Sequence, residues 1–353
     1  MNIIKAGYEF IPEQEGFLSL CKKIELVART CYKSEDLITE TSCIKMIENL
    51  IKRKHYAMLE HASLVFKVDR YSYYATTTTV LSLQNQVFEG HEYETFKSYL
   101  RFTEDGNNDS YIISGNIRAW IEFLQMSTKI YNKIPFFFKG YLDNRTAINT
   151  PTDEAILFHE FLDVPGDIGF AHFHQVTDFS ELTIRERLIH QDLSVKFTVD
   201  RGVTHELVRM RDCSFAQEST RFCNYSKGKF GEEITVINPC FFDTGMGARS
   251  NSLVYDAWRS SCEVAEEKYF ELLGYDATPQ QARDVLSTSV KADIIMTTNI
   301  REWIHILELR ALGVTGKPHP QMEEVMVPLA KELATGLLSD FTCIDSVNKM
   351  LSL

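Results

Sequence analysis

The chain has 353 residues and a formal net charge of −12, with 44% hydrophobic and 12% aromatic residues. This apolar content is ample for a packed core and excludes a disordered or collagen-like protein. The acidic balance argues against general binding to nucleic acid, whose affinity comes from neutralising phosphates. No apolar run approaches the roughly 20 residues that cross a bilayer, and no secretory signal is recognisable. We therefore expect a cytoplasmic protein with no nucleic-acid or membrane partner.

Eight cysteines are spread singly, and none forms the Cys-x-x-Cys pair that zinc and redox sites favour. A chain of this length needs no disulfide framework, so we expect reduced, buried thiols. They are Cys21, Cys31, Cys43, Cys213, Cys223, Cys240, Cys262 and Cys343. The pair His172-x-His174 is a candidate metal site, but nothing nearby supplies a third ligand at a recognisable spacing. The sequence therefore predicts no metal.

Hydrophobic periodicity predicts both helices and strands before residue 190. Apolar residues between 41 and 54 recur at helical spacing, whereas Ser63–Asp69 alternates like a half-buried strand. The predicted elements are helices at 12–31, 41–54, 116–133 and 152–163, a strand at 63–69, a polar loop at 104–110 and a threonine run at Thr76–Thr79. The stretch from about 70 to 190 is less regular than the rest.

Regular patterns return after residue 190. We predict a strand at 193–200, a short helix from Gly202 to Arg211 and a strand at 233–238. The C-terminal third is predicted to be helical, beginning with a helix at 254–273 that ends at Gly274.

Two N-terminal capping patterns mark helix starts in this third. Thr278 precedes Gln281 in one, and Asn299 precedes Glu302 in the other. A last helix follows His319-Pro320. The apolar faces of the last two helices comprise Ile300, Trp303, Ile304 and Leu307, then Met322, Val325, Leu329 and Leu333.

Two pairs of segments resemble each other within the chain. Ser63–Arg70 is similar to Ser194–Arg201, and Asn116–Leu124 is similar to Asn299–Leu307. A single tandem duplication would give one offset, but these pairs have different offsets. They are therefore not a simple repeat.

Cations gather between residues 209 and 229. They are Arg209, Arg211, Arg221, Lys227 and Lys229, opposed only by Asp212 and Glu218, and short polar residues lie between them at Ser214, Gln217, Ser219 and Thr220. The planar fork of arginine grips phosphate or a pyrimidine edge through two parallel hydrogen bonds. On composition alone, the alternative is a solvated surface loop of mixed charge.

The order of these residues resembles the hallmark of the flavin-dependent thymidylate synthases. That hallmark is Arg-His-Arg, two residues, Ser, four residues, Ser-x-Arg-Tyr. Here the chain has Arg209-Met210-Arg211, then Ser214, then Ser219-Thr220-Arg221-Phe222, with every spacing kept. Further matches in family order are Thr204–Val208, His55, Leu59-Glu60-His61, Ala282-Arg283, Asn299-x-Arg301, His305, Leu309-Arg310 and His319-Pro320-Gln321.

The resemblance implies a fold and an activity. The fold would be α+β, a mixed sheet packed with helices, in a single domain over 1–353 with an atypical insertion at about 65–190. The activity would be reductive methylation of dUMP to dTMP, with methylenetetrahydrofolate as carbon donor and NADPH-reduced, tightly bound FAD as hydride donor. Family members are homotetramers with composite active sites, which implies the same assembly here.

The resemblance also implies the site residues. The dUMP site would comprise Glu206, Leu207, Val208, Arg209, Gln217, Glu218, Ser219, Thr220, Arg221, Arg283 and Arg310. Arg310 would be catalytic, because a fixed cation beside the uracil stabilises negative charge as it develops. The FAD site would comprise His55, Ala57, Glu60, Arg209, Met210, Arg211, Gln217, Asn299, Ile300, Arg301, His305 and His319.

Two residues depart from the family pattern. Met210 replaces the central histidine and cannot hydrogen-bond as imidazole does. Phe222 replaces the terminal tyrosine and loses only its hydroxyl. Both changes spare the arginines, so we interpret them as modulation of the site.

Several alternatives stay open at this point. Arg310 could form a helix-surface ion pair with Glu302 or Glu308, and Arg301 with His305 could be ordinary surface charge on one helix face. The chain has no Gly-x-Gly-x-x-Gly fingerprint and no Walker loop, which argues against Rossmann-type binding. Competing functions are another nucleotide-acting flavin oxidoreductase and a non-catalytic nucleotide- or RNA-binding protein.

Overall fold

The computed structural model describes residues 1–12, 17–70, 72–74, 76–78, 100–105, 110–123, 173–221, 223–226, 231–242 and 248–353. The chain divides into two compact units that both contain strands and helices, so the mixed class is confirmed. Unit 1 comprises Met1–Ile11, Val27–Asp36 and Ser194–Leu353, and unit 2 comprises Pro12–Leu26 and Leu37–Leu193. Unit 2 therefore takes in more of the chain than the insertion expected at 65–190.

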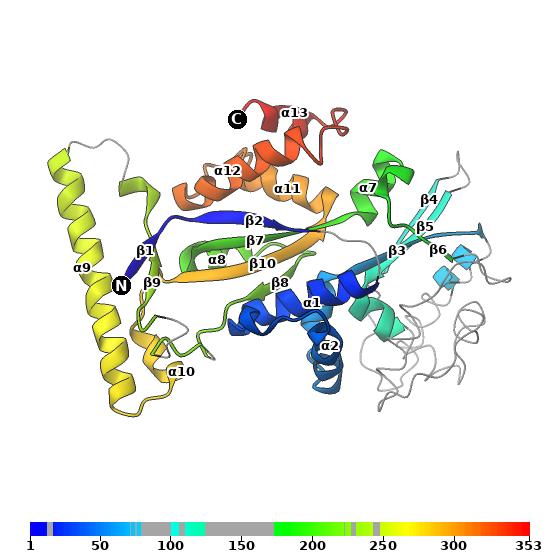
Figure 1. Ribbon diagram of the computed structural model, residues 1–353. Helices are drawn as coiled ribbons and strands as arrows, with labels where there is room; N and C mark the ends of the chain where they lie inside the picture. The colour runs from blue at the N-terminus through cyan, green and yellow to red at the C-terminus, as the bar shows by residue number, and fades with distance from the viewer. Residues whose placement is uncertain are drawn as a thin grey trace, which may run out of the picture. The chain divides into compact units, whose positions relative to one another are not determined.

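Unit 1 is built on a four-stranded sheet of order β2-β7-β10-β8 (Figure 1). The strands are β2 (Gly7–Ile11), β7 (Asp192–Asp200), β8 (Ser214–Gln217) and β10 (Lys291–Asn299). β2 runs antiparallel to β7, and β8 runs antiparallel to β10. The strand predicted at 193–200 is confirmed as β7.

The prediction of an all-helical C-terminal third was wrong at β10. Every residue from Ala292 to Asn299 is buried, so the strand is covered on both faces. Such a strand shows no alternation of polar and apolar residues, and periodicity alone does not reveal it. β8 was missed too, because four residues inside a polar loop carry too short a pattern.

Four helices follow these strands in unit 1. They are α8 (Arg201–Leu207), α11 (Ile300–Arg310), α12 (Pro320–Thr335) and α13 (Asp345–Leu351), and the last three lie together above the sheet in Figure 1. The predicted cap is confirmed, since Asn299 Oδ1 accepts a hydrogen bond of 2.8 Å from the Glu302 amide. The predicted apolar faces are buried as expected, and Trp303 is fully buried.

The rest of unit 1 is a smaller layer. β1 (Asn2–Ile4) pairs in parallel with β9 (Thr235–Ile237), beside η6 (Cys240–Phe242), α9 (Ala248–Gly274), α10 (Pro279–Ala282) and η7 (Arg283–Val285). The capping box at Thr278 and Gln281 forms as predicted. Tyr225, Tyr269 and Cys262 are buried in the apolar cluster of this layer.

Unit 2 holds a second four-stranded sheet, of order β4-β5-β3-β6. Its strands are β3 (Ser63–Val68), β4 (Arg101–Asp105), β5 (Ser110–Asn116) and β6 (Phe173–Gln175), all paired antiparallel. Its helices are α2 (Ser42–Lys52), η2 (Tyr56–His61), η4 (Phe179–Glu181), α7 (Ile184–His190) and helical residues at 72–74, 76–78 and 117–123. By sequence, α1 (Phe17–Tyr32) and η1 (Glu35–Leu37) each have residues in both units.

The predictions within this unit have mixed outcomes. The helix at 41–54 and the strand at 63–69 are confirmed, and the helix at 12–31 is confirmed from Phe17 onward, since residues 13–16 lie outside the described residues. The helix at 116–133 is confirmed from 117 to 123, and its remainder and the helix at 152–163 lie outside the described residues. The polar loop is shorter than predicted, since Glu104 and Asp105 belong to β4 and Ser110 begins β5.

The self-similar segments form the same strand–cap–helix structures. Asp69 accepts a hydrogen bond of 2.7 Å from the Ser72 amide, as Asp200 does at 2.8 Å from the Val203 amide. Asn116 caps the turn at 117–123 through the Ala119 amide at 2.8 Å, just as Asn299 caps α11.

The strands and helices of these segments also pack alike. The ring centroids of Phe66 and Trp120 lie 5.5 Å apart in unit 2, and those of Phe197 and Trp303 lie 6.4 Å apart in unit 1. β3 neighbours β5 as β7 neighbours β10. The offsets differ because β9, α9 and α10 separate β8 from β10, whereas only residues 106–109 separate β4 from β5. The described strands of unit 2 therefore repeat the strand order of the unit 1 sheet.

The cysteine and metal predictions can be compared with the described ranges. None of the eight cysteines, all within the described residues, forms a disulfide, and five of them are buried. Within those ranges no helix is long and apolar enough to cross a membrane. The same residues hold no group of three His, Cys, Asp or Glu side chains placed to bind a metal, and His172 lies outside them.

A buried histidine makes the stability of unit 2 depend on pH. The His190 ring nitrogens lie 2.7 Å from the Ser114 hydroxyl and 2.8 Å from the Thr103 hydroxyl. Burial, with a smaller contribution from Arg101, lowers the pKa of His190 from 6.5 to about 3. The unfolded chain therefore takes up a proton below about pH 6.5 that the folded chain excludes, so stability is full above this pH and falls toward pH 3.

We expect the free energy of unfolding to fall by about 2 kcal/mol between pH 7 and pH 5 because of His190. Urea denaturation at both pH values measures this loss. A His190→Gln variant keeps a hydrogen-bonding side chain without the titrating ring, so it should lack that part of the pH dependence. An equal loss in the variant and the original chain would contradict the assignment.

Candidate active site

The arginine-rich loop begins at a sharp turn after α8. The helix ends at Leu207 and not at Arg211, which corrects the predicted boundary. Asp212 has a left-handed φ of +53°, a conformation that cannot continue an α-helix. Its carbonyl accepts a hydrogen bond of 2.8 Å from the Thr298 hydroxyl on β10. The turn sends the chain back along the sheet edge as β8.

Pairing with β10 fixes the position of this loop. Ser214 lies opposite Thr297, and Gln217 lies opposite Ile294. The ladder continues past β8, since the Glu218 amide donates to the Asp293 carbonyl at 2.8 Å. Ser219–Arg221 therefore follows directly from a strand held against the most buried strand of the sheet.

Two predicted dUMP residues meet between α8 and α11. Arg310 Nη1 lies 3.3 Å from Glu206 Oε2, and the Arg310 side chain is 23% exposed. Arg310 therefore pairs with Glu206, and not with Glu302 or Glu308 as the alternative interpretation would require. Among the described residues, the buried Nε of Arg310 has no hydrogen-bond acceptor. A partly buried guanidinium with one N–H that lacks an acceptor is suited to binding a polar ligand.

Two further contacts tie the loop to neighbouring elements. Arg283 Nη1, from the turn after α10, donates to the Thr220 hydroxyl at 3.4 Å. Gln217 Nε2 donates to the Thr204 hydroxyl on α8 at 2.9 Å. The structure therefore brings Arg283 to the loop that carries the other predicted dUMP residues, while its contact with dUMP stays a prediction.

The remaining loop residues differ in exposure. Val208, Arg209, Arg211 and Arg221 are exposed, Met210 and Ser219 are half-buried, and Leu207 and Glu218 are buried. Leu207 is fully buried, so its side chain belongs to the core and only its backbone is open to a ligand role. Phe222 lies outside the described residues.

The predicted flavin residues of unit 1 lie on α11 and at the start of α12. Arg301 and His305 share an exposed face of α11, whereas Ile300 is buried. The ring of His319 caps α12, accepting from the Gln321 amide at 3.3 Å. It also meets the Phe241 ring edge-on, with centroids 6.0 Å apart.

Three predicted flavin residues belong to unit 2. His55 precedes η2 and is exposed, while Ala57 and Glu60 lie within η2. Glu60 forms an ion pair of 2.7 Å with Arg118 in the same unit. Their participation in a site with the arginine loop stays a prediction.

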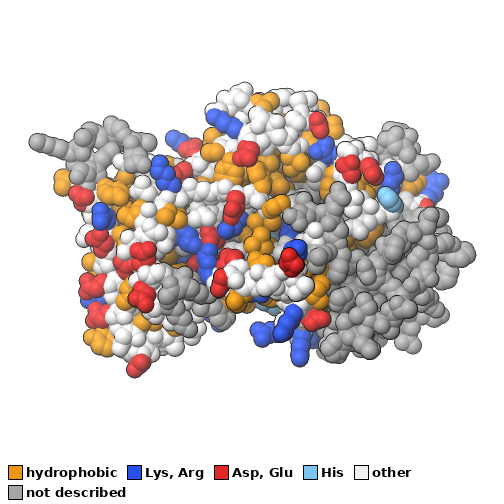
Figure 2. Space-filling model, viewed as in Figure 1, with side chains coloured by type: hydrophobic (Ala, Val, Ile, Leu, Met, Phe, Trp, Pro, Cys, Tyr) orange, Lys and Arg blue, Asp and Glu red, His pale blue; other side chains and the backbone are white. Residues whose placement is uncertain are grey.

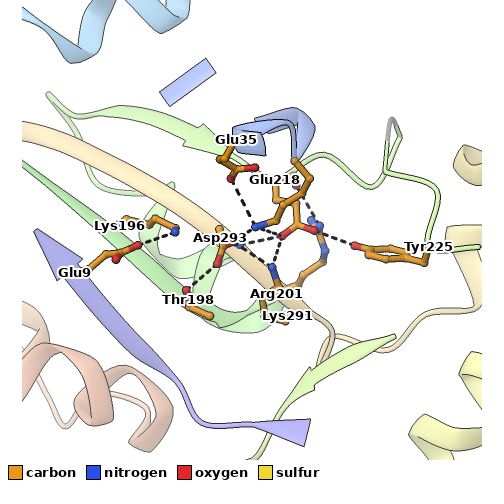
Figure 3. A network of polar contacts seen from close by, with 10 residues as sticks. Glu9, Glu35, Lys196, Thr198, Arg201, Glu218, Tyr225, Lys291 and Asp293 are labelled. Atoms are coloured by element: carbon orange, nitrogen blue, oxygen red, sulfur yellow. Dashed lines mark hydrogen bonds and ion pairs between the residues drawn. The ribbon is translucent and has the colours of Figure 1, made fainter. Parts of the chain in front are cut away.

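Sequence reasoning missed a buried network of charges behind the loop (Figure 3). Glu218, predicted to contact dUMP, is 1% exposed and pairs with Lys291 at 2.7 Å and Lys33 at 3.7 Å. Both lysines also pair with Asp293, which is 6% exposed. Lys291 and Asp293 are two positions apart on β10, and side chains at this spacing lie on the same face of a strand. Recognising the strand would therefore have placed both on one face.

The surface around these groups is uneven in charge. Acidic side chains gather over α9 on the face shown in Figure 2. The exposed guanidinium groups of Arg209, Arg211, Arg221 and Arg301 contrast with this acidic background. Such a concentration of cations in an acidic protein attracts an anionic ligand. The fold is thus a mixed helix-and-sheet structure, and the residues around the loop after β8 form a candidate anion-binding site.

Comparison with known proteins identifies the family of this chain. The family model described as thymidylate synthase complementing protein matches residues 20–81 and 185–335. The match covers more than half of the chain, and the chain belongs to this family. The flavin-dependent thymidylate synthase of Corynebacterium aurimucosum is 30% identical over 152 residues, which are 40% of this chain and 59% of the relative. That of Corynebacterium efficiens is 34% identical over 122 residues, 32% of this chain and 46% of the relative.

These relatives are matched only in part. The chain spans between 42% and 59% of the length of the first three curated relatives it matches. A solved structure, a UMP/dUMP methylase PolB from Streptomyces cacaoi bound with 5-Br UMP, is 21% identical, with a TM-score of 0.35. The similarity covers 41% of this chain and 69% of that one.

Proposed function

We propose that the chain is a flavin-dependent thymidylate synthase, a methyltransferase that converts dUMP to dTMP. Methylenetetrahydrofolate would supply the carbon, and NADPH would reduce the FAD. The observation that carries the proposal is the Arg310–Glu206 pair, in which a partly buried guanidinium keeps its buried Nε–H without an acceptor among the described residues. The family and the names of the curated relatives support the same reaction.

The nucleotide would lie along the loop after β8. Ser219 and Arg221 would hold the phosphate, because an exposed guanidinium beside a hydroxyl supplies several hydrogen-bond donors to phosphate oxygens. Arg283 would steady the loop through Thr220. Arg310 would lie beside the uracil, and Glu206 would hold its guanidinium in place.

The chemistry of uracil explains why a fixed cation matters. Negative charge develops on the ring as the uracil is activated at N3 for the attack of C5 on the carbon donor, and Arg310 would be oriented to stabilise that charge. FAD, when bound, supplies the hydride that completes the methyl group. The chain's part is to bind both ligands, to orient them and to exclude water.

The chemistry of the predicted flavin residues fits an anionic dinucleotide. Arg301 and His305 present donors from one exposed helix face, and His319 stands at the N-terminus of α12, where the helix dipole favours negative charge. By family resemblance, His55, Ala57 and Glu60 are also proposed flavin-binding residues. We further propose a homotetramer in the cytoplasm, with the small molecules dUMP, NADPH and methylenetetrahydrofolate as partners.

Arg221→Ala tests the assignment of the loop. We expect the dissociation constant for dUMP to rise about 10–100-fold, since charge-assisted hydrogen bonds to phosphate are lost, while FAD remains bound. Calorimetric titration with dUMP and the flavin absorbance of the purified protein measure the two effects. Arg259→Ala, on the exposed face of α9, serves as the control. Equal loss of both ligands would contradict the assignment, and a colourless protein that still binds dUMP would favour a non-catalytic nucleotide-binding protein.

A further inference from the structure

Glu218 stands immediately before the proposed phosphate-binding residues, and every polar group of Glu218 is engaged. Its amide donates to Asp293, and its carbonyl accepts from Arg201 Nη2 at 3.2 Å. One carboxylate oxygen accepts from the Tyr225 hydroxyl at 3.2 Å, and the other accepts from Lys291 at 2.7 Å (Figure 3). A side chain that is 1% exposed and fully occupied has nothing to offer a ligand.

The carboxylates of this network are balanced by two lysines from distant parts of the chain. Lys33, which follows α1, contacts Glu218 and Asp293, and Lys291 on β10 contacts the same two acids. Burial alone would lower the pKa of Lys33, but Glu218 and Asp293 outweigh it and raise that pKa. Burial would raise the pKa of Asp293, but Lys291 and Lys33 outweigh it and lower that pKa. Lys33 and Asp293 therefore stabilise each other's charged forms.

The end of α1 holds the loop in a second way. The Ser219 amide donates to the Cys31 carbonyl at 3.0 Å. Cys31 and Lys33 lie within one turn of each other, so the same helix end contacts both the backbone of Ser219 and the side chain of Glu218. Ser219 is thus fixed on one side by α1 and on the other by the sheet edge.

We propose that Lys33 and Lys291 are positioning residues that clamp Glu218 to the sheet edge and thereby hold Ser219–Arg221 in the geometry that grips the dUMP phosphate. This inference rests on the proposed function and assigns Glu218 a role different from direct contact with the nucleotide. The network acts on the loop after β8 and not on the exposed face of α11. Loss of a clamp residue should therefore weaken nucleotide binding and leave flavin binding unchanged.

Lys33→Gly separates positioning from simple stability. Lys33 has a left-handed φ of +50°, which glycine adopts without steric cost, so the backbone does not oppose the substitution. We expect the dissociation constant for dUMP to rise about tenfold because Glu218 loses one of its two cations, with FAD retained. Lys33→Arg keeps the charge and should bind dUMP nearly as the original chain does.

Lys196→Met is the matched control. Lys196 forms an ion pair of 2.6 Å with Glu9 across the same sheet and does not contact Glu218 (Figure 3). It should bind both ligands normally. Normal dUMP affinity in Lys33→Gly, or equal losses of dUMP and FAD, would overturn the inference.

Hydrogen exchange tests the clamp without any ligand. The amides of Glu218 and Ser219 are both hydrogen-bonded, to Asp293 and Cys31. In Lys33→Gly these two amides should exchange faster than in the original chain, whereas Lys196→Met should leave them protected. Unchanged exchange in Lys33→Gly would overturn the inference. If the original chain fails to bind dUMP, the proposed function falls, and the exchange rates still decide whether the lysines hold the loop.

Discussion

Arg310→Ala is expected to lower kcat for dUMP methylation by about 10²–10³-fold, the usual loss when a preorganised charge-stabilising donor is removed. Arg310 is largely buried at the end of α11, and Glu206 fixes its guanidinium. Its orientation is therefore set before the ligand arrives, which makes its electrostatic effect on the developing uracil charge large. Steady-state kinetics with saturating dUMP measure the effect.

Two companion variants separate catalysis from folding. Arg310→Lys keeps the charge but loses the planar fork, so we expect an intermediate kcat. Glu206→Gln keeps the size of the partner and loses its charge, and should lower kcat less than Arg310→Ala does. The proposal for Arg310 would be contradicted by a folded, FAD-containing Arg310→Ala protein with normal kcat.

Trp303→Ala should have the largest effect on stability, about 3–5 kcal/mol in the free energy of unfolding. The indole is fully buried between α11 and the unit 1 sheet, where it packs against Phe197 of β7. Its removal leaves a cavity directly behind α11, the helix that carries Arg301 and Arg310. Urea denaturation followed by circular dichroism measures the loss.

Tyr275→Ala is the surface control for this prediction. Tyr275 is 75% exposed just beyond α9, so its truncation should change the free energy of unfolding by at most about 0.5 kcal/mol. Trp120→Ala should destabilise the chain as Trp303→Ala does, since Trp120 occupies the matching place in unit 2 against Phe66. A loss below that of the control in Trp303→Ala would contradict the packing described here.

Local sequence signals predicted the helix starts well. Asn299 and Thr278 cap their helices as their spacing indicated, because a cap is a contact between residues three positions apart. The inward faces of α11 and α12 followed from helical periodicity for the same reason. The resemblance to a family selected Arg283 and Arg310, which no local pattern singles out. In the structure Arg283 contacts Thr220 in the arginine-rich loop, and Arg310 contacts Glu206 on α8, the helix before that loop.

Contacts between residues far apart in the chain could not be predicted from the sequence. β10 is buried on both faces and carries no alternation, so its place in the sheet was missed, and with it the partners of Glu218. Lys33 contacts Asp293 although the two residues are separated by most of the sequence, and no spacing rule predicts such a contact. The self-similar segments had unequal offsets because connecting segments of different length separate equivalent strands. Their common plan became visible only through their caps and aromatic pairs.

The central claim is the conversion of dUMP to dTMP, and one assay tests it directly. Purified protein is incubated with dUMP, NADPH and methylenetetrahydrofolate, and dTMP is quantified by chromatography, with Arg310→Ala as the control. We predict dTMP formation that requires all three substrates, from a protein with the absorbance of bound FAD. Bound FAD and bound dUMP without any dTMP would contradict the account.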